Sequence, residues 1–217
     1  MSETPQPFYV ARAKRVLDIV GSSLLLLVTA PILVLLALAV AAGDGRPIFF
    51  HQSRVGRDGK IFSLHKFRTM TVGTELIAGS YPTPAMVTRV GRALRRFSLD
   101  EIPQLANILR GEMSFVGPRP TLPSQVARYT AEQRGRHVVR PGLTGLAQIR
   151  HRNNAPWSQR ITTDLEYVRN VSLRMDSWIL LRTIPAALTG GGQLIGQTPA
   201  EVDDLNPHQI MLDQDND

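Results

Sequence analysis

Two neighbouring carboxylates, Asp100 and Glu101, are the residues of this 217-residue sequence best suited to chemistry. Arginines are frequent around them: four lie between positions 89 and 96, and Arg119 follows between two prolines. One carboxylate of such a pair can attack phosphorus to form an acyl phosphate. The other can hold Mg²⁺ beside a diphosphate. These residue types and their spacing indicate phosphoryl chemistry on a phosphate-bearing substrate.

The same pair also has a purely structural interpretation. Acidic side chains in the first turn of a helix stabilise its dipole, and Ser98-x-x-Glu101 matches a capping box. Proline fits the first turn of a helix without cost, whereas farther inside it kinks or breaks the helix. Because Pro103 is present, we expect a helix that begins near Leu99 and stops at Gly111.

The charge distribution points to phosphate-bearing partners. Residues 1–198 hold 25 cations against 12 acids, and 22 of those cations are Arg. The planar guanidinium pairs with phosphate oxygens, so nucleic acid, anionic lipid and a nucleotide are all candidates. A membrane-tethered nucleic-acid binder is one alternative, although only 13 aromatic residues are available for stacking. A non-catalytic membrane scaffold is another. The absence of cysteine excludes disulfides, thiolate metal sites and a cysteine nucleophile.

An uncharged apolar run covers residues 19–42. A bilayer-spanning helix needs about 20 such residues. Pro31 lies at the midpoint, and each half of 12 residues makes about 18 Å of helix. The run can therefore form a kinked span or a re-entrant hairpin that turns at residues 29–31. Basic residues flank both ends, and the positive-inside bias favours the hairpin with both ends in the cytoplasm.

The remaining elements follow from local patterns. Two β-prone runs, 48–51 and 61–64, flank a Gly-Arg-Asp-Gly turn and predict a β-hairpin. Apolar spacing predicts helices over 86–97, 164–170 and 173–188. The composition of the last one suits a helix in the membrane interface as well as one facing a core.

These elements predict an α+β fold that is mainly helical. We expect an N-terminal re-entrant membrane helix-break-helix, a short β-hairpin, and amphipathic interface helices around a cytosolic catalytic core. The expected division is a membrane segment over 1–45, a catalytic domain over 46–198, and an acidic, disordered tail over 199–217.

Five blocks of sequence resemble the bacterial sugar transferase family, the polyprenol-phosphate phosphoglycosyl transferases, and are most similar to its small monotopic members. The blocks are KFRTM (66–70), SLDEIPQLANIL (98–109), GEMSFVGPRP (111–120), RPGLTGLAQI (140–149) and YVRNVSLRMD (167–176). They occur in the family's order and extend the resemblance from about Lys14 to about Leu188.

The resemblance implies a ping-pong transfer of a sugar phosphate. In the matching motif, Asp100 corresponds to the nucleophile that attacks a UDP-sugar and expels UMP, and Glu101 corresponds to the Mg²⁺ ligand. A polyprenyl (undecaprenyl) phosphate then takes the sugar phosphate from the aspartyl intermediate. The positions expected to bind substrate are Lys66, Arg68, Arg95, Arg119 and Arg140.

The resemblance also implies a location and partners. A re-entrant helix would hold the catalytic domain on the cytoplasmic face of the bacterial inner (plasma) membrane, in contact with lipids and with no nucleic-acid partner. The oligomeric state is left open. Two departures stand out: Ala30-Pro31 replaces the family's Ser-Pro at the hairpin turn, and Leu146 replaces a frequent aromatic. The first bears on the geometry of the turn, and the second fits a different sugar.

Overall fold

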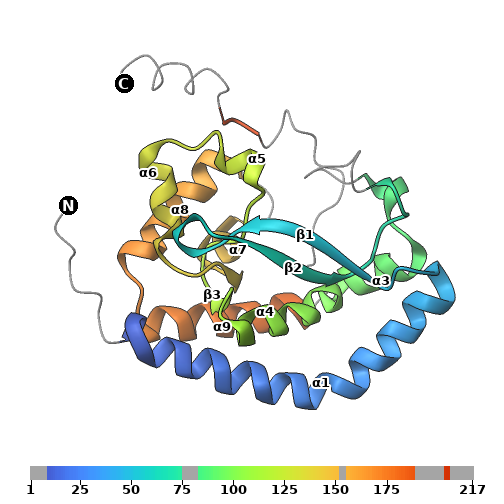
Figure 1. Cartoon of the computed structure of the whole chain (residues 1–217). Coiled ribbons are helices and arrows are strands. Elements are labelled where there is room, and N and C mark those ends of the chain that lie inside the picture. The colour runs from blue at the N-terminus through green and yellow to red at the C-terminus, as the bar shows by residue number, and fades with distance from the viewer. Residues whose placement is uncertain (1–8, 75–82, 152–154, 189–202, 206–217) are drawn as a thin grey trace.

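A computed structural model describes residues 9–74, 83–151, 155–188 and 203–205 of the chain. Within these residues the fold is mainly helical, with a long apolar N-terminal helix and a two-stranded hairpin, as the sequence predicts, and a second two-stranded sheet that was not predicted. Figure 1 shows α1 (Lys14–Asp44) along one side of the molecule, with the other elements gathered against it. A single π-helical turn, Tyr9–Ala13, leads into α1.

Helix α1 is one bent helix. It continues through Pro31, and Figure 1 shows it bent near its middle. Proline lacks the N–H that the helical ladder needs, which accounts for the bend. Nearby, the hydroxyl of Thr29 donates to the carbonyl of Leu25 at 2.6 Å. The expected break into two helices is therefore wrong. Among the described residues, α1 is the only helix long and apolar enough to cross a bilayer.

The two sides of α1 have different surroundings. On one side Leu33, Leu36 and Ala37 pack with Val40 around the buried Phe67 of the body. On the other side large apolar residues are exposed. These are Val16, Leu17, Ile19, Val20, Leu24, Leu25, Leu27, Val28, Ile32, Val34, Leu35 and Leu38. An exposed apolar surface of this length is typical of a lipid contact.

The N-terminal half of α1 is bound to the body by polar contacts. The Asp18 carboxylate accepts hydrogen bonds from Ser114 Oγ and Phe115 N, both at 3.0 Å. Arg15 donates to the carbonyls of Ile108 at 2.6 Å and Leu109 at 2.8 Å. These partners belong to two neighbouring elements, α4 (Leu105–Arg110) and β3 (Ser114–Val116).

The predicted β-hairpin is confirmed, with longer strands. Strand β1 (Phe49–Val55) pairs antiparallel with β2 (Ile61–Phe67), from Phe49 opposite Phe67 to Val55 opposite Ile61. The turn η2 (Arg57–Gly59) joins them. One face of the hairpin packs Phe62 and Leu64 against α4, in a core with Leu105, Ile108 and Met113.

A second core lies under a parallel pair of short strands. Strand β3 pairs with β4 (Gly142–Thr144), with Ser114 opposite Gly142 and Val116 opposite Thr144. Buried side chains connect these strands to three helices, α7 (Leu146–His151), α8 (Trp157–Arg169) and α9 (Leu173–Leu188). They are Val116, Val139, Leu146, Tyr167 and Ile179. Helix α9 has the predicted bounds, and α8 begins earlier than predicted.

The other short elements connect these cores. They are η3 (Pro84–Met86), α3 (Arg89–Arg96), η4 (Leu99–Gln104), α5 (Pro123–Val126), α6 (Ala131–Arg134) and η5 (Gly135–Val138). Three residues of the acidic tail are described, and they contact the body. Asp203 pairs with Arg128 at 2.7 Å, and Leu205 is buried against Tyr129. The rest of the predicted tail lies outside the described residues.

Candidate active site

The two carboxylates are carried by η4, a turn of 3-10 helix. Ser98, just before it, has φ 55°, in the left-handed region, so the chain changes direction after α3. The Ser98 side chain makes no capping hydrogen bond, although Glu101 N–H donates to the Ser98 carbonyl at 3.2 Å. The predicted capping box is therefore wrong. The Glu101 side chain has other partners.

Glu101 is held by two cations from distant parts of the chain. Its Oε1 accepts hydrogen bonds from Lys66 Nζ at 2.9 Å and from Arg119 Nη2 at 3.1 Å. Lys66 is the penultimate residue of β2, and Arg119 follows β3. Burial alone would raise the pKa of Glu101, but the charges and hydrogen bonds of Lys66 and Arg119 lower it to about 2. The carboxylate is ionised at neutral pH.

Asp100 lies beside the same cations but is not bound by them. Its relative exposure is 3%, and no hydrogen bond to its carboxylate occurs within the described residues. Burial raises its pKa, and the charge of Glu101 acts in the same direction, while Lys66, Arg95 and Arg119 act against it. A buried carboxylate near cations, with its oxygens not committed to hydrogen bonds, is suited to act as a nucleophile.

Arg95 is brought to the carboxylates by α3. Its Nε donates to Thr69 Oγ1 at 2.8 Å, while its buried Nη1 has no hydrogen-bond partner in the described part of the chain. Burial lowers the pKa of Arg95, and the charges of Asp100 and Glu101 oppose that shift. A buried guanidinium N–H without an acceptor costs free energy unless an anion satisfies it.

Arg54 of β1 was missed by the sequence analysis as a site residue. Its Nη1 donates to the carbonyl of Pro120 at 3.2 Å, and its buried Nε lacks a hydrogen-bond partner among the described residues. The pKa of Arg54 is lowered to about 10 by burial and then by the charge of Arg119, while Glu101 opposes the shift. These influences locate Arg54 next to the cluster formed by the two carboxylates and their cations.

The cluster has a surplus of positive charge. Four cations surround the two carboxylates: Arg54, Lys66, Arg95 and Arg119. With every group ionised, the cluster has a net charge of plus two. Two of the guanidinium groups also have buried N–H groups without acceptors, again counting only described residues. Both observations fit an anionic substrate with about the charge of a diphosphate.

Two residues that the resemblance assigned to substrate binding donate to backbone carbonyls. Arg68 is 3% exposed and donates to the carbonyls of Asp44 and Gly45 at the end of α1, the second at 2.9 Å. Arg140 donates to the Gly111 carbonyl at 2.9 Å. Burial lowers the pKa of Arg140, and the charges that influence it come from outside the cluster. Both arginines join backbone segments.

Two glycines let the loops on either side of the β3–β4 pair approach closely. A Cβ at Gly142 would lie 2.1 Å from the Gly117 nitrogen, and a Cβ at Gly117 would lie 2.4 Å from the Arg140 carbonyl oxygen. Any side chain at either position would push the loops apart. The GPRP and RPGLTG blocks are therefore packed backbone to backbone, which fixes where Arg119 begins.

The donor set fits Mg²⁺ that is shared with a substrate. No group of three or more metal-ligating side chains occurs in the described residues. Mg²⁺ is commonly held by one or two carboxylates together with substrate phosphates and waters, and does not need a cage made only of protein. The ionised Glu101 and the adjacent Asp100 provide such carboxylates.

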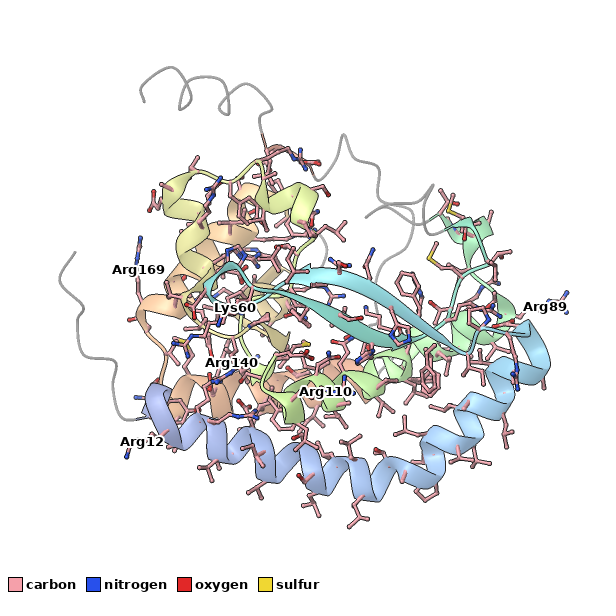
Figure 2. The ribbon with its side chains drawn as sticks, in the orientation of Figure 1. Arg12, Lys60, Arg89, Arg110, Arg140 and Arg169 are labelled. Carbon is pink, nitrogen blue, oxygen red and sulfur yellow. The ribbon has the colours of Figure 1, made fainter. Side chains whose placement is uncertain are left out.

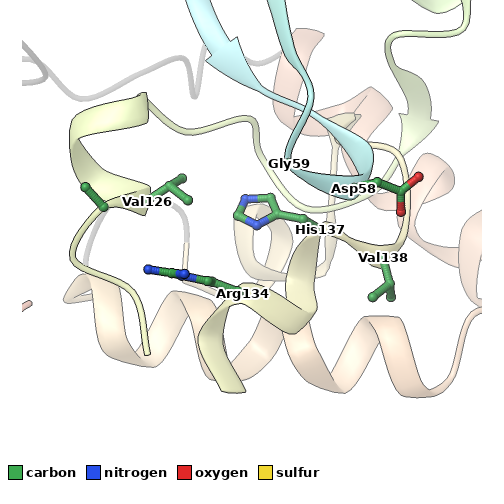
Figure 3. A pocket seen from close by; sticks show the side chains of 7 residues that line it. Asp58, Gly59, Val126, Arg134, His137 and Val138 are labelled. Carbon is green, nitrogen blue, oxygen red and sulfur yellow. The ribbon is translucent and has the colours of Figure 1, made fainter. Parts of the chain in front are cut away.

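A ligand-sized hollow of about 430 Å³ lies away from the carboxylates. Figure 3 shows it between the β1–β2 turn, at Asp58 and Gly59, and the side chains of Val126, Arg134 and His137. No residue of the carboxylate cluster lines it. Burial, followed by the charge of Arg136, lowers the pKa of His137 to about 4, so its ring is neutral.

Surface cations are spread around the molecule. Figure 2 shows Arg12, Arg89 and Arg169 at separate edges, with Lys60 on the hairpin and Arg110 on α4. A nucleic-acid backbone is usually bound by a continuous basic face.

Comparisons with known proteins identify relatives of this chain. The family model described as "Bacterial sugar transferase" matches residues 9–190. The chain is 41% identical over 179 residues to the uncharacterized sugar transferase EpsL of Bacillus subtilis, covering 82% of this chain and 89% of that protein. It is 44% identical over 186 residues to UDP-glucose:undecaprenyl-phosphate glucose-1-phosphate transferase of Caulobacter vibrioides, covering 81% and 70%. It is 37% identical over 196 residues to undecaprenyl-phosphate galactose phosphotransferase of Salmonella typhimurium, covering 82% and 41%.

Proposed function

The chain belongs to the bacterial sugar transferase family and is a phosphoglycosyl transferase, and we propose that it transfers a sugar 1-phosphate from a UDP-sugar to polyprenyl (undecaprenyl) phosphate. The products are the polyprenyl diphosphate sugar and UMP. The observation that carries the proposal is the buried Asp100 carboxylate, which has no hydrogen bond in the described residues and lies beside Lys66, Arg95 and Arg119. The substrate class is supported by the names of the relatives.

The proposed reaction has two steps. In the first, an oxygen of Asp100 attacks the phosphorus that carries the sugar, and the bond from that phosphorus to the UMP oxygen breaks. UMP leaves with the electron pair, and an aspartyl sugar phosphate remains. In the second, an oxygen of polyprenyl phosphate attacks the same phosphorus. The bond to Asp100 then breaks and the carboxylate is regenerated.

The cations provide charge for these steps. Arg95 and Arg119 stabilise the negative oxygens of the phosphate groups, and their partly buried setting strengthens that interaction. Lys66 and Arg119 keep Glu101 ionised, first through their charges and then through their hydrogen bonds. Glu101 is the residue that would hold Mg²⁺, which neutralises the diphosphate and polarises the leaving group.

We propose that α1 is re-entrant and does not cross the bilayer. Its N-terminal half is bound to α4 and β3, and its last residues are bound by Arg68 and Thr88. Both ends therefore contact one body, as a helix that enters and leaves on one side requires. The positive-inside bias puts that side in the cytoplasm. Exposed apolar residues on α9, including Trp178 and Leu181, fit a helix in the membrane interface.

The product would serve as the first membrane-bound intermediate of a glycan. Two relatives, each 38% identical over 197 residues, are named exopolysaccharide production protein ExoY, from Rhizobium meliloti and Sinorhizobium fredii. We propose exopolysaccharide, capsule, O-antigen or glycoprotein assembly as the destination of the product.

The test uses the whole purified chain in lipid nanodiscs that contain undecaprenyl phosphate. UMP release is measured with a panel of UDP-sugars, and Asp100→Asn is expected to abolish it while the melting temperature is retained. Without the lipid acceptor, labelled UMP should exchange into the UDP-sugar, because the first step is reversible through the aspartyl intermediate. No UMP release by the wild type with any UDP-sugar would refute the proposed function. Full turnover by Asp100→Asn would refute the nucleophile.

A further inference from the structure

The loop over residues 118–121, which carries Arg119, is fixed through its carbonyls. At one end Gly142 N donates to the Pro118 carbonyl at 2.9 Å. At the other end Val55 N donates to the Thr121 carbonyl, also at 2.9 Å. The prolines on either side of Arg119 have no N–H to offer, so the loop must be held mainly as an acceptor.

The two carbonyls in the middle of the loop are bound by arginine side chains. Arg136 Nη2 donates to the Arg119 carbonyl at 2.9 Å. Arg54 Nη1 donates to the Pro120 carbonyl at 3.2 Å. Thus all four successive carbonyls of this loop accept a hydrogen bond, and the two around the Arg119–Pro120 peptide take theirs from charged donors. Hydrogen bonds from charged donors are about twice as strong as neutral ones.

Arg136 is itself held in one position by buried hydrogen bonds. Its side chain is 2% exposed and pairs with the equally buried Asp164 of α8. Its Nε donates to Asp164 Oδ2 at 3.1 Å, and its Nη1 donates to Thr121 Oγ1 at 3.1 Å and to Tyr129 at 3.3 Å. Burial alone would lower the pKa of Arg136, but Asp164 and Tyr129 raise it. The guanidinium therefore remains charged and has one orientation.

The side chain of Arg119 depends on this backbone. It is 36% exposed, so packing alone leaves it considerable freedom, while the flanking Pro118 and Pro120 are buried. Its guanidinium must reach Glu101 Oε1, 3.1 Å away. A displacement of about 1 Å at a group that orients a reacting phosphate can cost about 100-fold in rate.

We propose that Arg54 and Arg136 are positioning residues that fix the backbone at Arg119, through the carbonyls of Pro120 and Arg119, and so direct its guanidinium to the substrate phosphates. This inference rests on the proposed function, because it assigns Arg119 to the phosphates of the UDP-sugar. Asp164 contributes by holding Arg136.

The test is a double-mutant cycle on kcat/KM for the UDP-sugar, measured as UMP release by the whole chain in nanodiscs. One variant is Arg54→Met. The second is the pair Arg136→Met and Asp164→Leu, which removes the donor without leaving a buried charge unpaired and so preserves folding. Each is combined with Arg119→Ala, and melting temperatures are recorded in both backgrounds.

Each positioning variant should lower kcat/KM by about 10- to 100-fold when Arg119 is present. With Arg119→Ala, the pair Arg136→Met and Asp164→Leu should lower it by less than about twofold, since there is no guanidinium left to direct. Arg54→Met should lower it by less than it does when Arg119 is present, and what remains is the contribution of the Arg54 charge itself. Arg54→Lys, which keeps a charged donor, should recover much of the loss caused by Arg54→Met. A melting-temperature change, in contrast, should be the same in both backgrounds.

Arg128→Met is the matched control. Arg128 forms an ion pair with Asp203 at 2.7 Å in the same part of the fold, so this variant should lower the melting temperature and leave kcat/KM unchanged. Losses that multiply in the Arg119→Ala background would overturn the positioning role, as would full activity of Arg119→Ala itself. An inactive wild type would instead refute the proposed function, so the two failures are distinguishable.

Discussion

Replacing Gly91 by alanine tests whether the contact between α3 and the backbone of Thr69 sets the position of Arg95. Gly91 faces the backbone of Thr69, and a Cβ added there would lie 2.2 Å from the Thr69 carbonyl oxygen and 2.6 Å from its Cα. Both are backbone atoms and cannot rotate away. Ordinary contact begins at 3.4 Å, so α3 must move outward by about 1.2 Å to accept the methyl group.

That displacement is large for Arg95, which lies one turn farther along α3. Its Nε is 2.8 Å from Thr69 Oγ1, and moving outward by the same amount takes the two atoms to about 4 Å, beyond hydrogen-bonding distance. A misplacement of about 1 Å can cost about 100-fold. We therefore expect Gly91→Ala to lower kcat/KM for UMP release by about 100-fold. Overpacking should also cost about 1–3 kcal/mol of unfolding free energy.

The assay compares UMP release at a temperature at which every variant is folded. Gly135→Ala is the matched control, because the nearest atom to a Cβ there is Leu165 Cδ2 at 3.4 Å, an ordinary contact. It should keep wild-type kcat/KM and a melting temperature at or above that of the wild type. Wild-type kcat/KM in Gly91→Ala would refute the idea that contact with Thr69 positions Arg95.

Further predictions concern stability. Burial lowers the pKa of His137 to about 4 in the folded state, whereas in the unfolded chain it is about 6.5. The unfolded chain therefore binds a proton more readily, and the free energy of unfolding falls as the pH drops from about 6.5 to about 4. His137→Gln should make the melting temperature fall less steeply over that pH range. Asp204 accepts from Ser158 N at 3.0 Å and caps α8, so Asp204→Ala should cost about 1 kcal/mol in thermal unfolding. Gly111 has φ 86°, so Gly111→Ala should cost about 1–2 kcal/mol in denaturant unfolding.

Local patterns predicted the elements whose signals are local. The hairpin followed from two β-prone runs around a Gly-rich turn, and Gly111 ends α4 in the left-handed conformation expected of a helix stop. The capping box failed although its sequence pattern is complete. Ser98 takes the left-handed conformation, and two cations from other parts of the chain provide a stronger partner for Glu101 than a backbone N–H. Tertiary contacts decided that position.

Site residues were predicted unevenly for a related reason. A block shared with a family does not show which partners a cation has within the protein. Lys66 pairs with Glu101, whereas Arg68 and Arg140 donate to backbone carbonyls. Arg54 was missed because it was treated only as a charge flanking the apolar run. Strand alternation could have found it. In the hairpin register Arg54 lies opposite Phe62 and Phe50 lies opposite Lys66, which puts Arg54 and Lys66 on one face.

Arg68 links the C-terminal end of α1 to the segment that carries Lys66. Arg68 binds the last carbonyls of α1 and lies two residues after Lys66. On the other side, Thr88 Oγ1 donates to Asp44 Oδ2 at 2.6 Å, and the same hydroxyl caps α3 by accepting from Gly91 N at 2.9 Å.

The end of α1 is thereby joined to the two elements that carry Lys66 and Arg95. The proposed transfer from a soluble UDP-sugar to a lipid phosphate requires the nucleophile to stay at the level of the lipid phosphates. Under that proposal, joining the end of α1 directly to the elements that hold the cations would meet this requirement, because a change in the depth of α1 would be transmitted to the site through two short polar links.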